Sequence, residues 1–255
     1  MRDIIEIYND FLVKKDKLKK ITRDVQAAGR FSASSAGLCA KKLWFQKNNY
    51  PYEPFKPDLL RLFRLGTIVG RDIEEAMFQY KEGHFERPDN VKVYSEKYIK
   101  DDDLGIGGSF DLLVVDGDRK GYLYDYKTCN SWKWRSMFGY KKSSNPSSNY
   151  EFQLGTYAMM LDKSKEFCDE IVEMSLIYYN KDNSMMKSKN VSLAYIEFAE
   201  KYWKKAIETA NMVEQPINSK ISPYYPNWEC KTKKDGTSYC SYIDHCNSIY
   251  KNEVK

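Results

Sequence analysis

Apolar and polar residues alternate along this chain with two different periods, which predict helices and strands in turn. Apolar positions recur at helical spacing in residues 3–30 and again in 57–80, so two long amphipathic helices are expected there. The runs at 91–99, 111–115 and 121–128 are strand-like, and the residues between the last two, Asp-Gly-Asp-Arg-Lys, are typical of a hairpin turn. The middle of the chain therefore predicts a strand followed by a β-hairpin.

The second half continues with helix and strand patterns separated by a polar segment. Residues 141–149 are rich in Ser, Asn and Pro and predict a loop. Residues 150–164 have a helical pattern, residues 170–180 read as a strand, and residues 192–213 predict an amphipathic helix that contains Trp203. Strands that lie before, between and after helices indicate a mixed α/β fold, with a central β-sheet flanked by helices.

Length and composition fit one soluble domain with appendages. The chain has 255 residues, of which 42% are hydrophobic and 30% charged, typical of a globular protein. No apolar stretch reaches membrane-spanning length, so we expect no membrane association. The N-terminus lacks the pattern of a signal peptide, which favours a cytoplasmic location. A net charge of +5 permits nucleic-acid binding but does not establish it.

The predicted hairpin carries the chemistry of greatest interest. Asp125 and Lys127 are two residues apart in one strand, so their side chains share a face, and the hairpin can bring Asp111 alongside them. Two carboxylates and one ammonium in a cleft suit metal-dependent phosphodiester hydrolysis, because carboxylate oxygens bind Mg²⁺ or Mn²⁺. The alternative is an ordinary hairpin with charged residues near its strand ends.

Aromatic and cationic residues interleave just after this hairpin. Such a segment can stack on bases and neutralise phosphates, which is how single-stranded nucleic acid is held. The alternative is a solvated helix or loop face. The candidate DNA-binding residues are Trp132, Lys133, Trp134, Arg135, Lys141 and Lys142.

Four of the six cysteines are placed as a possible ligand set: Cys39 alone, then Cys230, Cys240 and Cys246 near the C-terminus. Disulfides are disfavoured without a secretion signal. A Cys₄ zinc site is possible, although close pairs such as Cys-x₂-Cys are absent. A Cys₄ iron–sulfur cluster fits one distant cysteine and a trio. We interpret the other two, Cys129 and Cys168, as unpaired thiols.

The hairpin resembles the core motif of the PD-(D/E)XK nuclease superfamily, with Asp111 as the first acid and Asp125-Tyr126-Lys127 as the acid-x-Lys triplet. A Thr after the triplet is most similar to the RecB-like exonuclease branch. The resemblance implies a restriction-endonuclease-like core. It also implies Mg²⁺ or Mn²⁺ held by both acids and the carbonyl of Tyr126, with Lys127 orienting water or stabilising developing charge.

Two further motifs of this family have counterparts here. Gln153 and Tyr157 resemble its Gln-x-x-x-Tyr pair, which shares a helix face, and the resemblance implies that both position the DNA strand at the catalytic site. Family members also carry a Gly-x-x-x-His segment in an upstream helix. Here the segment begins at Gly66, and Gly70 stands where the His would be. Glu74 lies one helical turn later and is the expected substitute metal ligand.

The cysteines resemble those of RecB-like exonucleases of the CRISPR-associated and AddB types, which hold a 4Fe–4S cluster. Residues 34–45 are similar to the segment around their first ligand, and Cys240 and Cys246 match their closing Cys-x₅-Cys. The gap from Cys230 to Cys240 is wider than in the family. The resemblance implies a cluster on Cys39, Cys230, Cys240 and Cys246, with Zn²⁺ as the alternative.

We therefore expect a single nuclease domain over 1–255. Its parts are an N-terminal helical segment at 1–30, a first cluster-ligand segment at 31–56, a PD-(D/E)XK core at 57–215, and a Cys-rich segment at 216–255 that staples the chain's two ends together. The expected function is a Mg²⁺- or Mn²⁺-dependent DNA exonuclease acting on single strands or ends, because no sequence-reading module is recognisable. The alternatives are an endonuclease of the same fold and a catalytically weakened DNA-binding subunit.

Overall fold

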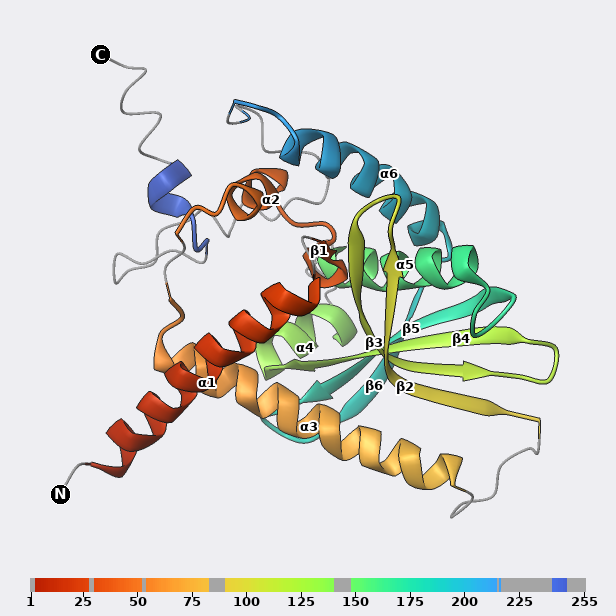
Figure 1. Ribbon diagram of the computed structural model, residues 1–255. Helices are drawn as coiled ribbons and strands as arrows, with labels where there is room; N and C mark the ends of the chain where they lie inside the picture. Colours follow the sequence, from red (N-terminus) through yellow and green to blue (C-terminus); the bar gives the residue numbers. More distant parts are fainter. Residues whose placement is uncertain are drawn as a thin grey trace.

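The central sheet has six strands and lies between two layers of helices (Figure 1). The computed structural model describes residues 3–27, 30–51, 54–82, 90–139, 148–214, 216 and 240–246. The strands are β1 (Phe31–Ser32), β2 (Lys92–Asp101), β3 (Ile106–Val115), β4 (Lys120–Cys129), β5 (Glu170–Asn180) and β6 (Met186–Val191). The mixed α/β fold expected from the sequence is confirmed, and so are the predicted strand and hairpin in its centre.

Pairing within the sheet is mixed. The order is β1-β3-β4-β5-β6, with β2 also paired to β3; β1/β3 and β4/β5 are parallel, and the other pairs are antiparallel. Both β1 and β4 pair with the edge of β3 opposite β2: β1 at Ile106–Gly107 and β4 at Leu112–Val115. Between them, among the described strands, residues 108–111 of β3 have no partner on this edge. The sheet therefore forks at Asp111.

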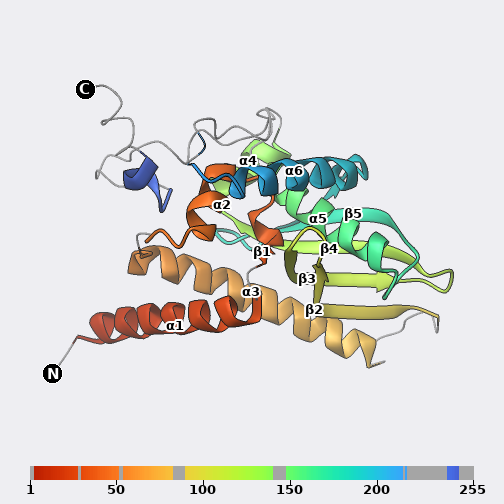
Figure 2. The ribbon, with the colours of Figure 1, turned by 45° about the horizontal axis from the view of Figure 1, so that its top comes forward.

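The helices form two layers, which are clearest in Figure 2. One layer contains α1 and α3, and the opposite layer contains α5 and α6, with α2 packed beside α6. The helices are α1 (Ile4–Ala27), the 3₁₀ turn η1 (Ala33–Ser35), α2 (Ala40–Lys47), α3 (Pro57–Lys81), α4 (Ser131–Phe138), α5 (Ser148–Ser164) and α6 (Ala194–Ala210). None of the helices within the described ranges is long and apolar enough to cross a membrane.

The pair α5 and α6 anchors one layer to the sheet. Trp203 of α6 is fully buried, stacks on Phe31 with ring centroids 6.4 Å apart, and donates from its indole Nε1 to Thr156 Oγ1 on α5 at 2.9 Å. The helices approach so closely that a Cβ at Gly155 would lie 2.3 Å from the carbonyl oxygen of Tyr195. Burial of this large side chain with its indole N–H satisfied fixes α5 over the sheet.

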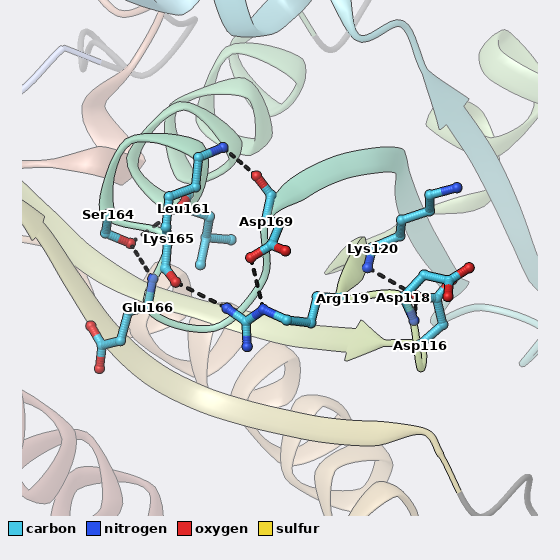
Figure 3. Close-up of polar contacts among 9 residues, drawn as sticks. All are labelled: Asp116, Asp118, Arg119, Lys120, Leu161, Ser164, Lys165, Glu166 and Asp169. Atoms are coloured by element: carbon cyan, nitrogen blue, oxygen red, sulfur yellow. Dashed lines mark hydrogen bonds and ion pairs between the residues drawn. The ribbon is translucent and has the colours of Figure 1, made fainter.

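A polar network closes the end of the hairpin far from the fork (Figure 3). Asp116 Oδ1 accepts from the backbone N–H of Lys120 at 2.9 Å, which shapes the turn. Arg119 then donates from Nε to Asp169 Oδ1 at 2.7 Å and from Nη2 to the carbonyl of Lys165 at 3.1 Å, linking the turn to the segment between α5 and β5. These contacts join the hairpin turn to the segment that leads into β5, the strand that pairs with β4 along the Asp125-Tyr126-Lys127 triplet.

Candidate active site

Asp111 is tied to the opposite strand at the fork. The β3–β4 ladder ends at the pair Leu112 and Tyr124. Beyond it, Asp111 Oδ2 accepts a hydrogen bond of 2.7 Å from the backbone N–H of Tyr126. A carboxylate oxygen of β3 thus binds the N–H of β4 where a backbone carbonyl would do so within the ladder. The carboxylate is thus held beside the triplet as β3 and β4 separate.

Asp125 and Lys127 form a buried ion pair on the α5 side of the sheet. Asp125 is fully buried, and Lys127 Nζ contacts its Oδ2. Gln153 of α5 donates from Nε2 to Asp125 Oδ1 at 3.2 Å. The structure therefore brings Asp111, Asp125, Lys127 and Gln153 together.

Burial and neighbouring charges shift the pKa values of the charged groups at the fork. Burial, followed by the charge of Asp125, raises the pKa of Asp111 to about 7, although Lys127 and the Tyr126 N–H oppose the shift. Burial also raises the pKa of Asp125. Burial acts to lower the pKa of Lys127, but the adjacent Asp125 and Asp111 outweigh it and raise the pKa. The lysine is therefore an ammonium held by carboxylates.

Tyr157 lies one helical turn after Gln153 on α5, and its side chain is buried. Its side chain is buried against β3, where a Cβ on Gly108 would lie 3.0 Å from the Tyr157 hydroxyl, so glycine leaves the room that this tyrosine occupies. Burial, with the nearby charge of Asp125, raises the pKa of Tyr157, and a hydrogen bond from Gln153 opposes the shift. Tyr157 and Gln153 thus form a chain of contacts that ends on Asp125. Contact of this pair with DNA stays a prediction.

Two glutamates complete the acidic group at the fork, one of which the sequence analysis missed. Glu74 comes from α3, on the opposite side of the sheet from α5. Glu96 of β2, which was not singled out, lies across from Asp111 with φ 49°, and its carboxyl lies within electrostatic reach of Glu74. Burial, then the charges of Asp111 and Glu74, raise the pKa of Glu96 to about 8. Carboxyl groups from four elements therefore lie close enough to affect one another's charge at the fork.

The segment after β4 forms helix α4, which was expected only as an aromatic and cationic segment. Trp132 is 70% exposed, whereas Trp134 is buried against Phe138, with ring centroids 4.8 Å apart. Of the two rings, only that of Trp132 is open to a nucleobase as placed. Arg135 is exposed, and Lys133 lies over the ring of Tyr150. Lys141 and Lys142 lie outside the described residues, and DNA contact by this segment stays a prediction.

The two cysteine-bearing segments lie against each other. Cys39 precedes α2 and is buried, and so is Cys240. Residues 240–246 pack on α2 through Tyr242, which stacks on Phe45 at 5.3 Å, and His245 Nε2 lies 2.9 Å from the carbonyl of Pro51. The cysteines recorded without a disulfide are Cys39, Cys129, Cys168, Cys240 and Cys246. Cys230 lies outside the described residues.

As placed, no group of three or more His, Cys, Asp or Glu side chains could hold a metal ion in the part of the chain that the structure describes. The donors at the fork are all hard oxygens, the chemistry that Mg²⁺ and Mn²⁺ prefer. In addition, the Tyr126 hydroxyl is buried without a hydrogen-bond partner among the described residues, beside Asp111, Glu74 and Glu96. The donor set therefore fits a hard divalent cation in its chemistry.

A profile of the PD-(D/E)XK nuclease superfamily matches residues 23–247, a span that contains the whole fork. The chain belongs to this superfamily. The six-stranded mixed sheet flanked by helices agrees with the restriction-endonuclease-like fold of PD-(D/E)XK nucleases. Membership supports a nuclease, and it implies DNA as the substrate. No curated protein matches the chain.

Solved structures similar to this PD-(D/E)XK protein include SSO0001, with a TM-score of 0.55 at 19% identity over 95% of this chain and 97% of that one. This likeness shows the fold. An alkaline exonuclease, LHK-Exo from Laribacter hongkongensis, has a TM-score of 0.40 at 18% identity over 71% of this chain and 88% of that one. The structure of the same exonuclease in complex with dAMP has a TM-score of 0.39 at 18% identity, over 72% of this chain and 89% of that one.

Tyr150 of α5 provides a first prediction for this nuclease. The centre of its ring lies 4.9 Å from Lys127 Nζ and 4.3 Å from Lys133 Nζ, so the ring contacts both ammonium groups. Such cation–π contacts contribute about 1–2 kcal/mol when partly desolvated. Tyr150→Leu is therefore expected to lower kcat for DNA cleavage roughly tenfold, whereas Tyr150→Phe keeps the ring and most of the activity. Equal losses in both variants would show that the hydroxyl, not the ring, matters.

Proposed function

We propose that this protein is a divalent-metal-dependent DNA exonuclease that acts on single strands or strand ends. The proposal is based on one observation: Asp111, Asp125 and Lys127 lie close together at the fork of β3 and β4. The chain belongs to the PD-(D/E)XK nuclease superfamily. The buried ion pair and the raised pKa of Asp111 favour a reactive site over an ordinary charged hairpin.

The residues that would hold Mg²⁺ or Mn²⁺ are Asp111, Asp125, the carbonyl of Tyr126 and Glu74. When bound, the metal polarises the scissile phosphate and lowers the pKa of a coordinated water. Lys127, kept as an ammonium by Asp125, orients the attacking water or stabilises the charge that develops on the phosphate. Gln153 fixes the Asp125 carboxylate through the hydrogen bond at its Oδ1.

Residues at the surface of α4 would bind the substrate strand. The exposed ring of Trp132 is suited to stack on a base, and Lys133 and Arg135 from the same short helix would neutralise phosphates. Stacking and phosphate contacts do not read sequence, which favours end processing over site-specific cleavage. Gln153 and Tyr157 would position the strand indirectly, by holding Asp125.

The decisive assay compares end-labelled linear and circular single-stranded DNA in the presence of Mn²⁺. An exonuclease degrades the linear strand and leaves the circle intact, whereas an endonuclease of the same fold cuts both. A DNA-binding subunit with weakened catalysis would bind the strands without cutting them. If the wild type and Lys127→Ala both left every substrate intact, the nuclease proposal would fail.

The cysteines would hold a 4Fe–4S cluster through Cys39, Cys230, Cys240 and Cys246, with Zn²⁺ as the alternative. The proposal is supported by the packing of residues 240–246 on the α2 segment that follows Cys39. The cluster would join the two ends of the chain and take no part in hydrolysis. Purified protein should be brown and absorb near about 400 nm, as thiolate-ligated clusters do. Colourless protein that contains zinc and no iron would favour the alternative.

The raised pKa of Asp111 predicts how metal binding depends on pH. Its pKa rises from 3.8 to about 7, so within this window the folded protein binds more protons than the unfolded chain. This group's contribution to stability therefore falls as pH rises through the window, because an ionised Asp111 is buried and meets the charge of Asp125. A divalent cation relieves that repulsion.

Mg²⁺ is consequently expected to raise Tm more at about pH 8 than at about pH 5.5, where protons compete for the ligands. Differential scanning fluorimetry with and without Mg²⁺ measures the two shifts. In Asp111→Asn the difference between them should shrink, because the titrating group has been removed. Equal shifts at both pH values in the wild type would contradict the prediction.

A further inference from the structure

Helix α1 has apolar side chains on more than one face. On the face that packs against α3, Leu12 is only 5% exposed, and Asn9 Oδ1 accepts a hydrogen bond of 2.5 Å from Arg61 Nη1 of α3. Other apolar side chains of the same helix are open to solvent, with exposed fractions between 42% and 81%: Ile4, Ile5, Ile7, Tyr8, Phe11 and Leu18. Contact with α3 therefore covers one part of the apolar surface of α1 and leaves another part exposed.

Four of the exposed side chains have the spacing of a seam between paired helices. Ile4, Ile7, Phe11 and Leu18 are three, four and seven residues apart, which is the a/d spacing of a coiled coil with Lys14 at the intervening position. Because a helix turns once in 3.6 residues, these positions line the side of α1 opposite the face that contacts α3. A contiguous apolar stripe of this kind on a protein surface marks a site of association.

The charges of α1 indicate what the stripe associates with. Residues 3–10 contain three acids and no Lys or Arg, whereas residues 14–20 contain five lysines and one acid. Two copies of this helix in antiparallel orientation therefore place the acidic half of each against the basic half of the other. A pairing centred on Phe11 brings Asp3 of one copy close to Lys17 of the other. The surface is thus complementary to itself, as an interface with two-fold symmetry requires.

We propose that the exposed face of α1 is a dimerisation surface, on which a second copy of this chain docks its own α1 in antiparallel orientation. Helix α1 lies on the outer side of α3, away from the sheet (Figure 2), so a second copy can reach this face without displacing either helix. A contact between two helices is small, so the dimer should form and dissociate with concentration. The inference does not depend on the proposed nuclease function.

The test is sedimentation velocity of the full chain over a range of concentrations. The wild type is expected to shift from the mass of one chain toward that of two as its concentration rises. Phe11→Glu places a charge at the centre of the seam and should weaken dimerisation roughly 10- to 100-fold. Phe198→Glu is the matched control and should dimerise like the wild type, because Phe198 is also partly exposed, at 39%, but lies on α6 in the opposite layer.

Charge substitutions test the antiparallel orientation. Each of two triple variants gives the helix nearly one sign of charge, so both should be largely monomeric: Asp3→Lys/Glu6→Lys/Asp10→Lys and Lys14→Glu/Lys15→Glu/Lys17→Glu. The variant with all six substitutions exchanges the two halves, restores their attraction and should dimerise again. In a parallel pair, a change of sign in one half leaves like charges facing each other, so the triple variants would dimerise as the wild type does.

The outcomes decide between the possible occupants of this face. A dimer that is lost in Phe11→Glu, kept in Phe198→Glu and restored in the sixfold variant supports the inference, provided that the circular dichroism spectra are unchanged. A wild type that stays monomeric at every concentration overturns it. A monomeric wild type that binds vesicles of anionic phospholipid also overturns it, in favour of a membrane surface as the occupant. A dimer that persists in Phe11→Glu shows that the interface lies elsewhere.

Discussion

Asp125→Asn is expected to reduce DNA cleavage by roughly 10³-fold, the largest catalytic loss of any single substitution in this chain. Asp125 is fully buried, contacts the Lys127 ammonium through one oxygen and accepts from Gln153 through the other. The substitution removes one proposed metal ligand and the counter-ion of Lys127 together. Single-turnover cleavage of an end-labelled strand measures the loss. Asp118→Asn, in the exposed hairpin turn at the far end of the same β-hairpin, should retain wild-type activity.

Folding must be separated from catalysis in this experiment. Asp125→Asn leaves Lys127 largely buried without its partner, which costs about 3–5 kcal/mol when a buried ion pair is broken. The double variant Asp125→Asn/Lys127→Met removes both charges, and urea unfolding should show that it regains most of the lost stability. It should nevertheless stay inactive. A double variant that cleaves DNA would show that the pair supports the fold rather than the reaction.

The core of the site could be predicted because it depends on local rules. Asp125 and Lys127 share a face through the two-residue period of a strand, and the turn sequence that begins at Asp116 specifies the hairpin that brings Asp111 near them. The structure shows the hydrogen bonds that enforce this turn. Glu74 could be proposed because one helical turn separates it from Gly70.

Glu96 could not be predicted because its place depends on the pairing of two strands and on one unusual φ angle. The predicted strand at 91–99 contained it, but strand periodicity says nothing about the partner strand or about a left-handed backbone. The fork itself was also beyond local rules, because it arises where β1 and β4 share one edge of β3. The burial of Trp134 was missed because its partner Phe138 lies one turn later in a helix that was not predicted, and its partner Lys187 is distant in sequence.

Short elements were missed as well. Helices α2 and α4 have eight residues each, too few for a helical period to stand out from a polar background. Strand β6, Met186–Val191, is mostly exposed and polar, so it lacks the apolar alternation that marks a strand. Two of these elements depend on neighbours distant in sequence, because α2 packs on α6 and β6 pairs with β5.

Trp203→Ala is expected to have the largest effect on stability, lowering the free energy of unfolding by about 3–5 kcal/mol. Trp203 is fully buried, stacks on Phe31 and donates to Thr156, so its removal leaves a cavity between α5 and α6 and removes one of the two hydrogen bonds of the Thr156 hydroxyl. Urea unfolding measures the change. Trp132→Ala, which removes a tryptophan that is 70% exposed, should cost no more than about 0.5 kcal/mol.

A substitution at Thr156 tests the hydrogen bond of Trp203 separately from its packing. Because Thr156 lies on α5, the same substitution also tests whether this helix holds the candidate site. Thr156→Val keeps the volume but leaves the indole N–H without its acceptor, and it should cost about 1–3 kcal/mol, less than Trp203→Ala. Thr156 lies between Gln153 and Tyr157 on α5, so a loosened helix releases the contact on Asp125. Both variants should therefore lose cleavage at urea concentrations below the unfolding transition, whereas Asp118→Asn should not. Cleavage that persists up to the transition would show that Trp203 stabilises the fold without holding the site.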